Sequence, residues 1–203
     1  MIRIIMLTDI NFTLSALKIG VTLLLLLFCL QTILAQDNIN DINPLKNNQI
    51  KVNASVIGLS LNCEKSISRS LAINYEAGLS YSFYVGGGAL YGNRFGYELS
   101  PIFSIENRWY YNLHKRLIKN KPTINNSGNF LSLKAGYRAS PVVSKNLYNN
   151  PVFVIIPAWG IQRSIGKKVS FEFATGYAFI VDTHRKEWSR NINLSIKFGY
   201  ILK

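Results

Sequence analysis

The sequence is poor in cysteine, histidine and acidic residues, and it contains no long hydrophobic run. Two cysteines, two histidines and ten acidic residues stand beside 23 basic residues in a chain of 203. Although 48% of the residues are hydrophobic, no uninterrupted apolar run reaches the roughly 20 residues that a membrane-spanning helix needs. The length suits one domain, and the missing long run argues against a bundle of membrane helices.

The longest apolar run, Val21–Leu30, lies near the N-terminus. Lys18 precedes it, and the small residue Ala35 follows it before the polar Gln36. This order is typical of a cleaved secretory signal, although an uncleaved membrane anchor has the same composition. The predicted organisation is a signal peptide at residues 1–35, a flexible periplasmic leader at 36–48 and one folded domain at 49–203.

Cysteine use fits an exported chain that has no disulfide. Cys29 lies inside the apolar run, so removal of the signal leaves Cys63 alone and excludes an intramolecular bridge. Cys63 falls on an apolar strand face, where a thiol behaves as a small hydrophobic side chain.

The formal charge of +13 raises the question of nucleic-acid binding, because basic domains often bind phosphate backbones. Here the basic residues are spread over loops and one strand face, and the chain is predicted to be exported. We therefore predict no nucleic-acid partner and expect the phosphates of lipid headgroups as the anionic counterpart.

The strongest pattern is the alternation in Tyr97–Leu113. Its odd positions are nearly all aliphatic or aromatic, whereas its even positions include Glu98, Glu106 and Arg108. Side chains that alternate with period two belong to a strand between an apolar and a polar environment. The same alternation recurs in Ile50–Val56, Ile57–Ile67, Leu71–Phe83, Phe130–Ala139, Phe153–Arg163, Val169–Val181 and Asn191–Lys203.

The apolar side changes from even to odd numbers at Val56–Ile57, so a tight turn or a bulge must lie there. A turn gives eight strands, an even number that closes a barrel with both ends on the periplasmic side, and a bulge gives seven. The connections predicted to face outward are Val85–Gly96, Ser140–Asn150 and Asp182–Arg190, and those predicted to face the periplasm are Ser66–Ser70, His114–Asn129 and Ser164–Lys168.

Side-chain size indicates which face lines the interior. The polar faces are rich in glycine and serine, whereas the apolar faces carry large aromatic residues. Since an eight-stranded barrel has room inside only for modest side chains, the apolar faces belong outside. The predicted fold is an all-β, eight-stranded, antiparallel, up-and-down transmembrane β-barrel. A secreted soluble β protein is the alternative.

The closing segment Asn193–Tyr200, with the signal ending at Ala35–Gln36, resembles small outer-membrane β-barrel proteins of the OmpA/OmpX type. Arg108–Lys121 and Asn125–Leu131 also resemble outer-membrane barrels of unassigned function. The resemblance implies an outer-membrane location and a last strand, with Phe198 and Tyr200, that the barrel assembly machinery reads. The chain departs from the family by ending on Ile201-Leu202-Lys203 instead of an aromatic residue.

Charged residues on the polar faces form the main candidate site. Because unpaired charges are costly in a narrow lumen, we expect them to pair and to plug the barrel. A gated ion path or a small-solute site is the functional alternative, although eight strands leave no open channel. The predicted lumen charge network comprises Lys51, Glu64, Glu76, Glu98, Glu106, Arg108, Lys134, Arg138, Glu172 and Lys197.

Catalytic and metal-binding patterns are weak. His114 and His184 fall in connections on opposite sides, so no metal site and no cofactor are predicted. His184, with Glu187 and Ser189 nearby in sequence, is the only outward candidate for a lipid-modifying enzyme.

Two clusters of basic residues are candidates for lipid contact. Arg185, Lys186 and Arg190 could contact lipopolysaccharide phosphates through charge-assisted hydrogen bonds. The second cluster is either solvated or docks an anionic headgroup or a periplasmic partner, and it comprises Lys115, Arg116, Lys119 and Lys121.

These patterns predict a monomeric outer-membrane protein with a structural or surface-interaction role and no catalysis. Its expected partners are outer-membrane lipids, lipopolysaccharide and, during biogenesis, the assembly machinery. A lipid-modifying enzyme and a narrow porin or transporter are the alternatives.

Overall fold

The computed structural model describes residues 45–88 and 92–202, with backbone alone for residues 87–88 and 92–94. The predicted signal and the predicted leader up to residue 44 lie outside the described residues. Leu45 is buried, and the backbone N–H of Lys46 donates to Asn126 at 2.8 Å. The chain therefore contacts the folded domain before its first strand begins at Asn48.

Nine strands and two short helices make up the described chain. In order they are β1 (Asn48–Ser55), β2 (Gly58–Ser66), β3 (Leu71–Gly88), β4 (Gly92–Trp109), α2 (Leu113–Ile118), η1 (Ile124–Asn126), β5 (Asn129–Arg138), β6 (Val143–Lys145), β7 (Val152–Ile165), β8 (Val169–Asp182) and β9 (Trp188–Ile201).

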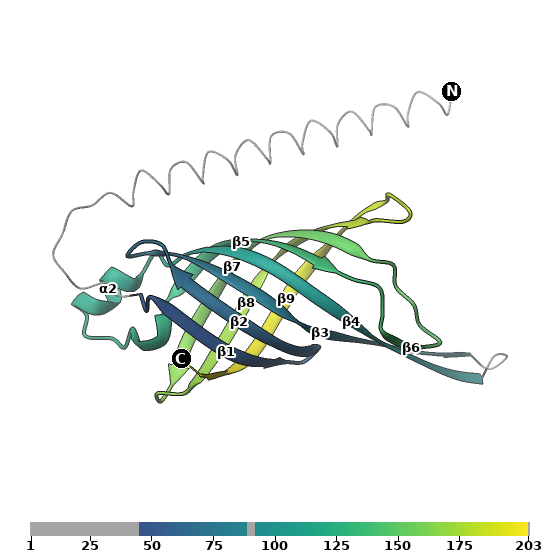
Figure 1. Cartoon of the computed structure of the whole chain (residues 1–203), viewed down its shortest axis with the longest axis horizontal. Coiled ribbons are helices and arrows are strands. Elements are labelled where there is room, and N and C mark those ends of the chain that lie inside the picture. The colour runs from purple at the N-terminus through teal and green to yellow at the C-terminus, as the bar shows by residue number, and fades with distance from the viewer. Residues whose placement is uncertain (1–44, 89–91, 203) are drawn as a thin grey trace, which may run out of the picture. The chain divides into compact units, whose positions relative to one another are not determined.

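Eight of these strands form a closed antiparallel barrel (Figure 1). The neighbours run β3-β2-β1-β9-β8-β7-β5-β4, and pairing of β3 with β4 closes the ring. The three-residue β6 pairs with β4 beyond the end of β5. Helix α2 lies at one end of the barrel, at the left of Figure 1, where β1 begins and β9 ends. We call this end the terminal end. The opposite end is the loop end.

The change of apolar side at Val56–Ile57 is a tight turn, as the count of eight strands requires. β1 and β2 pair from Asn48 with Lys65 up to Ser55 with Gly58. Gly58 has φ of +157°, and a Cβ there would collide with the carbonyl oxygen of Leu79 on β3. Glycine at this position therefore allows the chain to reverse close against its neighbour.

Several boundaries differ from the sequence prediction. β9 begins at Trp188 and β6 covers Val143–Lys145, both inside segments predicted as loops. β4 ends at Trp109 and not at Leu113, because Leu113 starts α2 and is buried. The β3–β4 hairpin is longer than expected, and its strands reach Gly88 and Gly92 inside the segment predicted as a loop. The connection predicted as a turn at 114–129 contains most of α2 and all of η1.

The distribution of polar and apolar side chains is inverted relative to a soluble protein. Among the described residues, 19 polar or charged residues are buried, against nine hydrophobic ones. Large hydrophobic side chains such as Leu59, Phe103 and Leu194 are exposed on the outer face. Soluble domains normally bury their apolar residues and avoid large exposed apolar surfaces. The core of this barrel is polar, and its outer surface is apolar.

Candidate functional site

All ten predicted lumen charges lie on the inward face of the wall. Each of them has an oppositely charged group within 4 Å, and they fall into three groups along the barrel. The terminal-end network contains Lys51, Glu64, Glu106, Arg108 and Glu172. The Glu76 layer contains Glu76, Lys134 and Lys197. The loop-end pair is Glu98 with Arg138.

Arg108 is the centre of the terminal-end network. Its guanidinium contacts three carboxylates, at 2.6 Å from Glu106, 2.8 Å from Glu172 and 3.4 Å from Glu64. It also lies 4.6 Å from the centre of the Phe130 ring, a cation–π distance. Because Arg108 is fully buried, these neighbouring groups, and not water, compensate its positive charge. Removal of one partner would leave a buried charge without compensation.

Uncharged groups complete the network, and sequence analysis missed them. Tyr110 donates its hydroxyl proton to Glu64 at 2.8 Å, and the Asn126 amide donates to the same carboxylate oxygen at 2.7 Å. The Gln162 side-chain oxygen accepts from Lys51 and Arg108. Burial, and then the Glu64 carboxylate, raise the pKa of Tyr110 well above its ordinary value, which keeps the donor proton in place.

Different signals could have revealed these three residues. Tyr110 occupies an even position in the alternation that starts at Tyr97, and Gln162 occupies the inward series of β7. Both could have been assigned to the lumen from period two alone. Asn126 comes from η1 in the β4–β5 connection, where no periodic pattern indicates a direction.

An asparagine ladder extends the network across the first strands. Asn53 donates to Asn62, Asn62 donates to Asn74 at 3.1 Å, and Asn74 donates to Glu106 at 3.3 Å. All three amides are buried. The ladder therefore links four consecutive strands through side chains as well as through the backbone.

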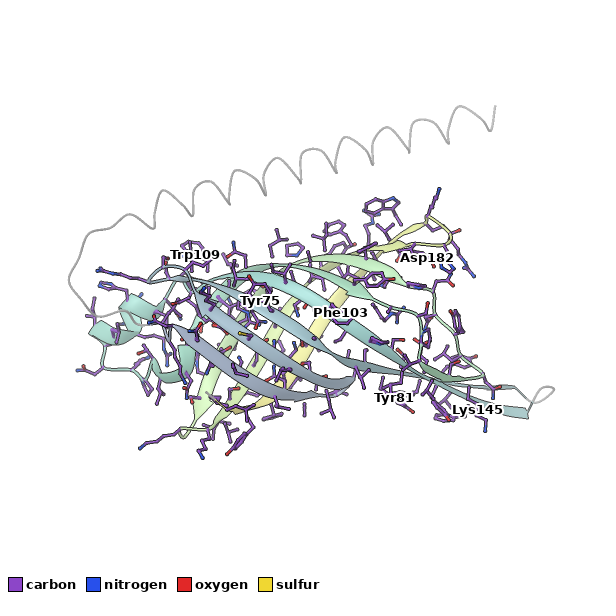
Figure 2. All side chains as sticks on the ribbon, in the orientation of Figure 1. Tyr75, Tyr81, Phe103, Trp109, Lys145 and Asp182 are labelled. Carbon is purple, nitrogen blue, oxygen red and sulfur yellow. The ribbon has the colours of Figure 1, made fainter. Side chains whose placement is uncertain are left out.

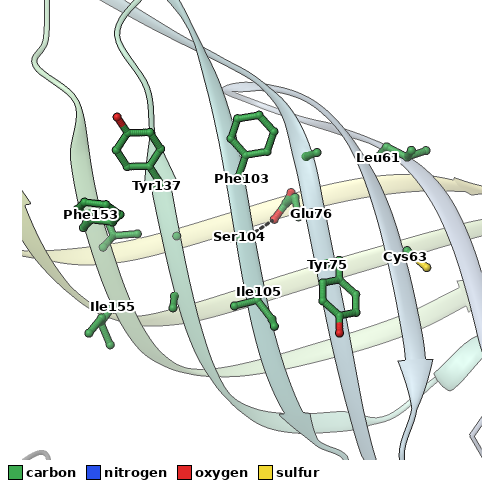
Figure 3. A pocket seen from close by; sticks show the side chains of 14 residues that line it. Leu61, Cys63, Tyr75, Glu76, Phe103, Ser104, Ile105, Tyr137, Phe153 and Ile155 are labelled. Carbon is green, nitrogen blue, oxygen red and sulfur yellow. Dashed lines mark hydrogen bonds between the residues drawn. The ribbon is translucent and has the colours of Figure 1, made fainter.

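The Glu76 layer lies nearer the loop end. Glu76 accepts from Lys197 at 2.6 Å and from Lys134 at 3.0 Å, and it also accepts hydrogen bonds from Ser60 and Ser104. The bond from Ser104 is drawn in Figure 3. Two ammonium groups against one carboxylate give this layer a formal charge of +1. Lys134 keeps 20% of its side chain exposed, so the layer is less enclosed than Arg108.

The β5–β7 connection covers part of the loop end. Asn149 donates its backbone and side-chain N–H groups to the two oxygens of Glu98 on β4, both at 2.7 Å. Its neighbour Asn150 donates to Asp182 at the end of β8, at 3.0 Å. Arg138 lies 3.5 Å from Glu98, and its Nε has no hydrogen-bond partner among the described residues. We call this bridge from β4 to β8 the loop-end cover.

Between the Glu76 layer and the loop-end cover, the inward face of the barrel becomes apolar. This apolar inner wall comes from β4, β7 and β8. The members of the apolar inner wall are Ile102, Val154, Ile156, Ala178 and Ile180. Ala178 is buried, whereas the other four side chains are only partly buried, in contrast to the terminal-end network.

Aromatic side chains on the outer face form two belts. Trp109 and Tyr200 lie toward the terminal end, whereas Tyr81, Phe83 and Trp188 lie toward the loop end. Figure 2 shows Trp109 and Tyr81 at opposite ends of the wall. Such belts are typical of the two water interfaces of a membrane barrel.

A groove of about 760 Å³ lies on the outer wall between the belts (Figure 3). Most of its lining comes from outward positions of β2 to β7, including Tyr75, Phe103 and Tyr137. The small residues Ala77 and Ala135 leave the space between these rings. The groove is an apolar recess in a face that already exposes hydrophobic side chains.

A basic cleft of about 470 Å³ lies at the terminal end beside α2. Its lining includes no acidic residue, and Tyr111, which accepts a hydrogen bond from Trp159 at 2.9 Å, forms one edge. The cleft brings Arg163 of β7 to the predicted basic cluster, which sequence analysis could not anticipate. Its cations are Lys115, Arg116, Lys119, Lys121 and Arg163.

The other predicted residues lie apart from the lumen network. Arg185, Lys186 and Arg190 are exposed at the loop end, in the β8–β9 connection and the start of β9. Phe198 and Tyr200 point outward from β9, opposite Ala54 and Val52 of β1.

The two histidines lie far apart. His184 is exposed in the β8–β9 connection, and its backbone N–H donates to Asp182 at 2.8 Å. His114 lies in α2 at the other end of the barrel. Within residues 45–88 and 92–202, no group of three or more metal-ligating side chains comes together.

No helix in the described part of the chain is long and apolar enough to span a membrane. No protein-family model, curated protein or solved structure matches the chain.

Proposed function

We propose that the protein is an integral outer-membrane β-barrel with a structural or surface-interaction role. The observation that carries this proposal is the inverted distribution of side chains, with paired charges inside and large hydrophobic residues outside. Water would oppose such an outer face, whereas the hydrocarbon of a bilayer favours it. In the terminal half of the wall, the closed ring of strands pairs the backbone N–H and C=O groups with one another. The interior of a membrane offers these groups no water, so they need such partners there.

The two ends of the barrel suit two different lipid surfaces. In this proposal the terminal end faces the periplasm, where the basic cleft beside Tyr111 contacts anionic headgroups. The exposed Arg185, Lys186 and Arg190 at the loop end meet lipopolysaccharide phosphates. The aromatic belts lie between these two sets of cations, as interfacial residues do.

The proposal includes neither conduction nor catalysis. Arg108 and its carboxylates fill the terminal half of the lumen, so we expect no steady large openings in single-channel recordings. Replacement of His184 by alanine should leave the lipid A mass spectrum unchanged. A changed lipid A profile would favour the lipid-modifying alternative, and steady conductance would favour a porin.

Membrane insertion can be tested with fractionation and with the single described cysteine. The protein should fractionate with outer membranes and show heat-modifiable gel mobility. Cys63 points outward from β2 between the belts, so a membrane-impermeant maleimide should label it only after unfolding.

A matched control moves the thiol to water. In a Cys63→Ala background, Arg69→Cys places a cysteine in the exposed β2–β3 turn, where the reagent should label the folded protein. A soluble product without heat-modifiable mobility, or equal labelling of both positions in vesicles, would overturn the proposal.

A further inference from the structure

The barrel wall is incomplete at the loop end, because the β1–β2 hairpin is much shorter than its neighbours (Figure 1). β9 pairs with β1 only from Lys197 to Ile201, and β3 pairs with β2 only up to Ser80. Beyond these points β9 keeps only β8 as a partner, and β3 keeps only β4, among the described residues. Tyr81 still donates its backbone N–H to Ile57 in the β1–β2 turn. We call the unpaired interval between residues 82–86 of β3 and residues 188–196 of β9 the side gap.

The β9 side of the side gap lies at the depth of the apolar outer face, whereas its β3 side lies at the loop-end belt, beside Phe83. Ile192 and Leu194 on β9 lie between Trp188 and Tyr200, and they are 81% and 63% exposed. They flank a backbone edge that has no strand beside it in the described part of the chain. Bare strand edges at hydrocarbon depth are tolerated only where they are buried in protein or line a watery cavity. In the proposed membrane-inserted protein, this edge of β9 must therefore face the barrel lumen.

Inside the side gap, described features bound the loop half of the lumen on three sides. The Glu76 layer forms the floor, since Lys197 on β9 lies opposite Ser55 at the end of β1, just below the gap. The loop-end cover bridges β4 and β8 over part of the loop end. The apolar inner wall lies on β4, β7 and β8. The side gap lies between β3 and β9, where the wall lacks a strand among the described residues.

From this arrangement we infer that the side gap admits an anionic single-chain amphiphile, of the fatty-acid type, from the surrounding membrane into the loop half of the lumen. Its head group lies on the Glu76 layer near Lys134, and its hydrocarbon chain lies along the apolar inner wall. This inference rests on the proposed membrane insertion. It gives a role to inward-facing Ile102, Val154 and Ile156, which a charge-plugged lumen does not require.

The chemistry of the compartment favours an amphiphile over a polypeptide strand. β3 and β9 are separated by three interstrand spacings of about 4.8 Å each, so one added strand would pair with one edge and leave the other bare. A peptide strand would also leave the apolar inner wall without a partner. An acidic head group meets the net positive charge of the Glu76 layer, and a hydrocarbon chain meets the inner wall.

Photo-crosslinking in phosphatidylcholine vesicles tests this inference. A long-chain fatty acid with a diazirine near its methyl end would be incorporated with the folded protein, irradiated and mapped by mass spectrometry. We expect adducts on the inward Ile156 and Ile180 in addition to the lipid-facing wall. The analogous fatty alcohol should label the inner wall much less, and equal labelling would overturn the assignment of the head group to the Glu76 layer.

Two neighbouring substitutions on β9 provide a matched pair. Asn193 points inward at the side gap and Leu194 points outward, so Asn193→Trp should abolish the inner-wall adducts whereas Leu194→Trp should preserve them. Heat-modifiable mobility and flotation with vesicles establish that each variant is folded and inserted. A protein that does not insert contradicts the proposed function.

Two results with an inserted barrel would overturn the lateral entrance alone. One is adducts confined to outward positions. The other is equal inner-wall labelling of Asn193→Trp and Leu194→Trp, which would show that the ligand does not enter past β9.

Discussion

The two halves of the lumen are built differently. In the terminal half all eight strands are present, and every charged side chain of the network is nearly inaccessible and held by several partners. In the loop half the β1–β2 hairpin has ended, most of the apolar inner wall is partly exposed and the wall contains the side gap. The difference indicates that the terminal half supplies stability, whereas the loop half keeps surfaces that a ligand can use.

The same contrast explains why so much charge is tolerated in a narrow barrel. The terminal-end network contains two bases and three acids, and the Glu76 layer contains two bases and one acid. The excess carboxylate of one group offsets the excess ammonium of the other, and the loop-end pair is neutral. This compensation between groups stabilises the terminal half. The Glu76 layer, which lies nearest the side gap, keeps its own formal charge of +1.

The largest expected effect is at Arg108, where the difference between the halves should be clearest. Arg108→Met leaves Glu64, Glu106 and Glu172 buried without their main cation, which should destabilise the barrel by about 3 to 5 kcal/mol. Guanidinium unfolding in vesicles, followed by heat-modifiable mobility, measures the loss. Arg69→Met in the exposed β2–β3 turn is the control, and equal stability of the two variants would contradict a stabilising terminal half.

A smaller effect is expected at Asn126, which caps the same network from η1. Asn126→Gly suits the φ of 60° at this position and removes the donor to Glu64 and the acceptor of the Lys46 N–H. Loss of a hydrogen bond to a buried carboxylate should cost about 1.5 to 3 kcal/mol. The exposed Asn120 offers the control substitution Asn120→Gly, which suits its φ of 50°. A neutral result at Asn126 would show that η1 only covers the network.

In the loop half, Lys134→Gln should have a still smaller effect, about 1 kcal/mol or less, because Lys134 is partly exposed. Glu76 would keep Lys197, Ser60 and Ser104 as partners. The same unfolding assay measures the change in the free energy of unfolding. A loss of stability as large as that of Arg108→Met would contradict the distinction between the two halves. The variant should, however, weaken labelling of the inner wall by the fatty-acid probe.

The smallest effect on stability is expected at the basic cleft. Lys119→Gln with Lys121→Gln should change unfolding by no more than about 0.5 kcal/mol, as exposed substitutions usually do. Association with anionic vesicles should nevertheless fall, and its dependence on salt should weaken. Flotation at several salt concentrations measures this. The matched control is Lys65→Gln, which removes an exposed cation on β2 outside the cleft.

Period-two alternation was sufficient to predict the wall of the barrel. The even strand count, the turn at Val56–Ile57 and the inward direction of Arg108 all follow from which residues share a face. Side-chain size then indicated that the small polar faces belong inside. These features depend on local geometry, which the sequence specifies residue by residue.

Features that depend on distant partners could not be predicted in this way. Nothing in the sequence near Asn126 indicates that η1 turns its amide toward Glu64, 62 residues away. The shortness of the first hairpin was visible in the sequence, but the side gap requires knowledge that β3 and β9 continue past it. The long β3–β4 hairpin was missed because its glycines were taken as a sign of a loop.

The pairing of β1 with β9 also determines how the barrel can form. Only five residue pairs make this seam, and they join positions as far apart as Lys51 and Ile201. Contacts between such distant segments form late, because the entropy of closing the chain opposes them until other strands have aligned. The ring should therefore grow as an open sheet by consecutive hairpins and close in one final step. Substitutions that weaken the seam should slow closure more than they weaken the finished barrel.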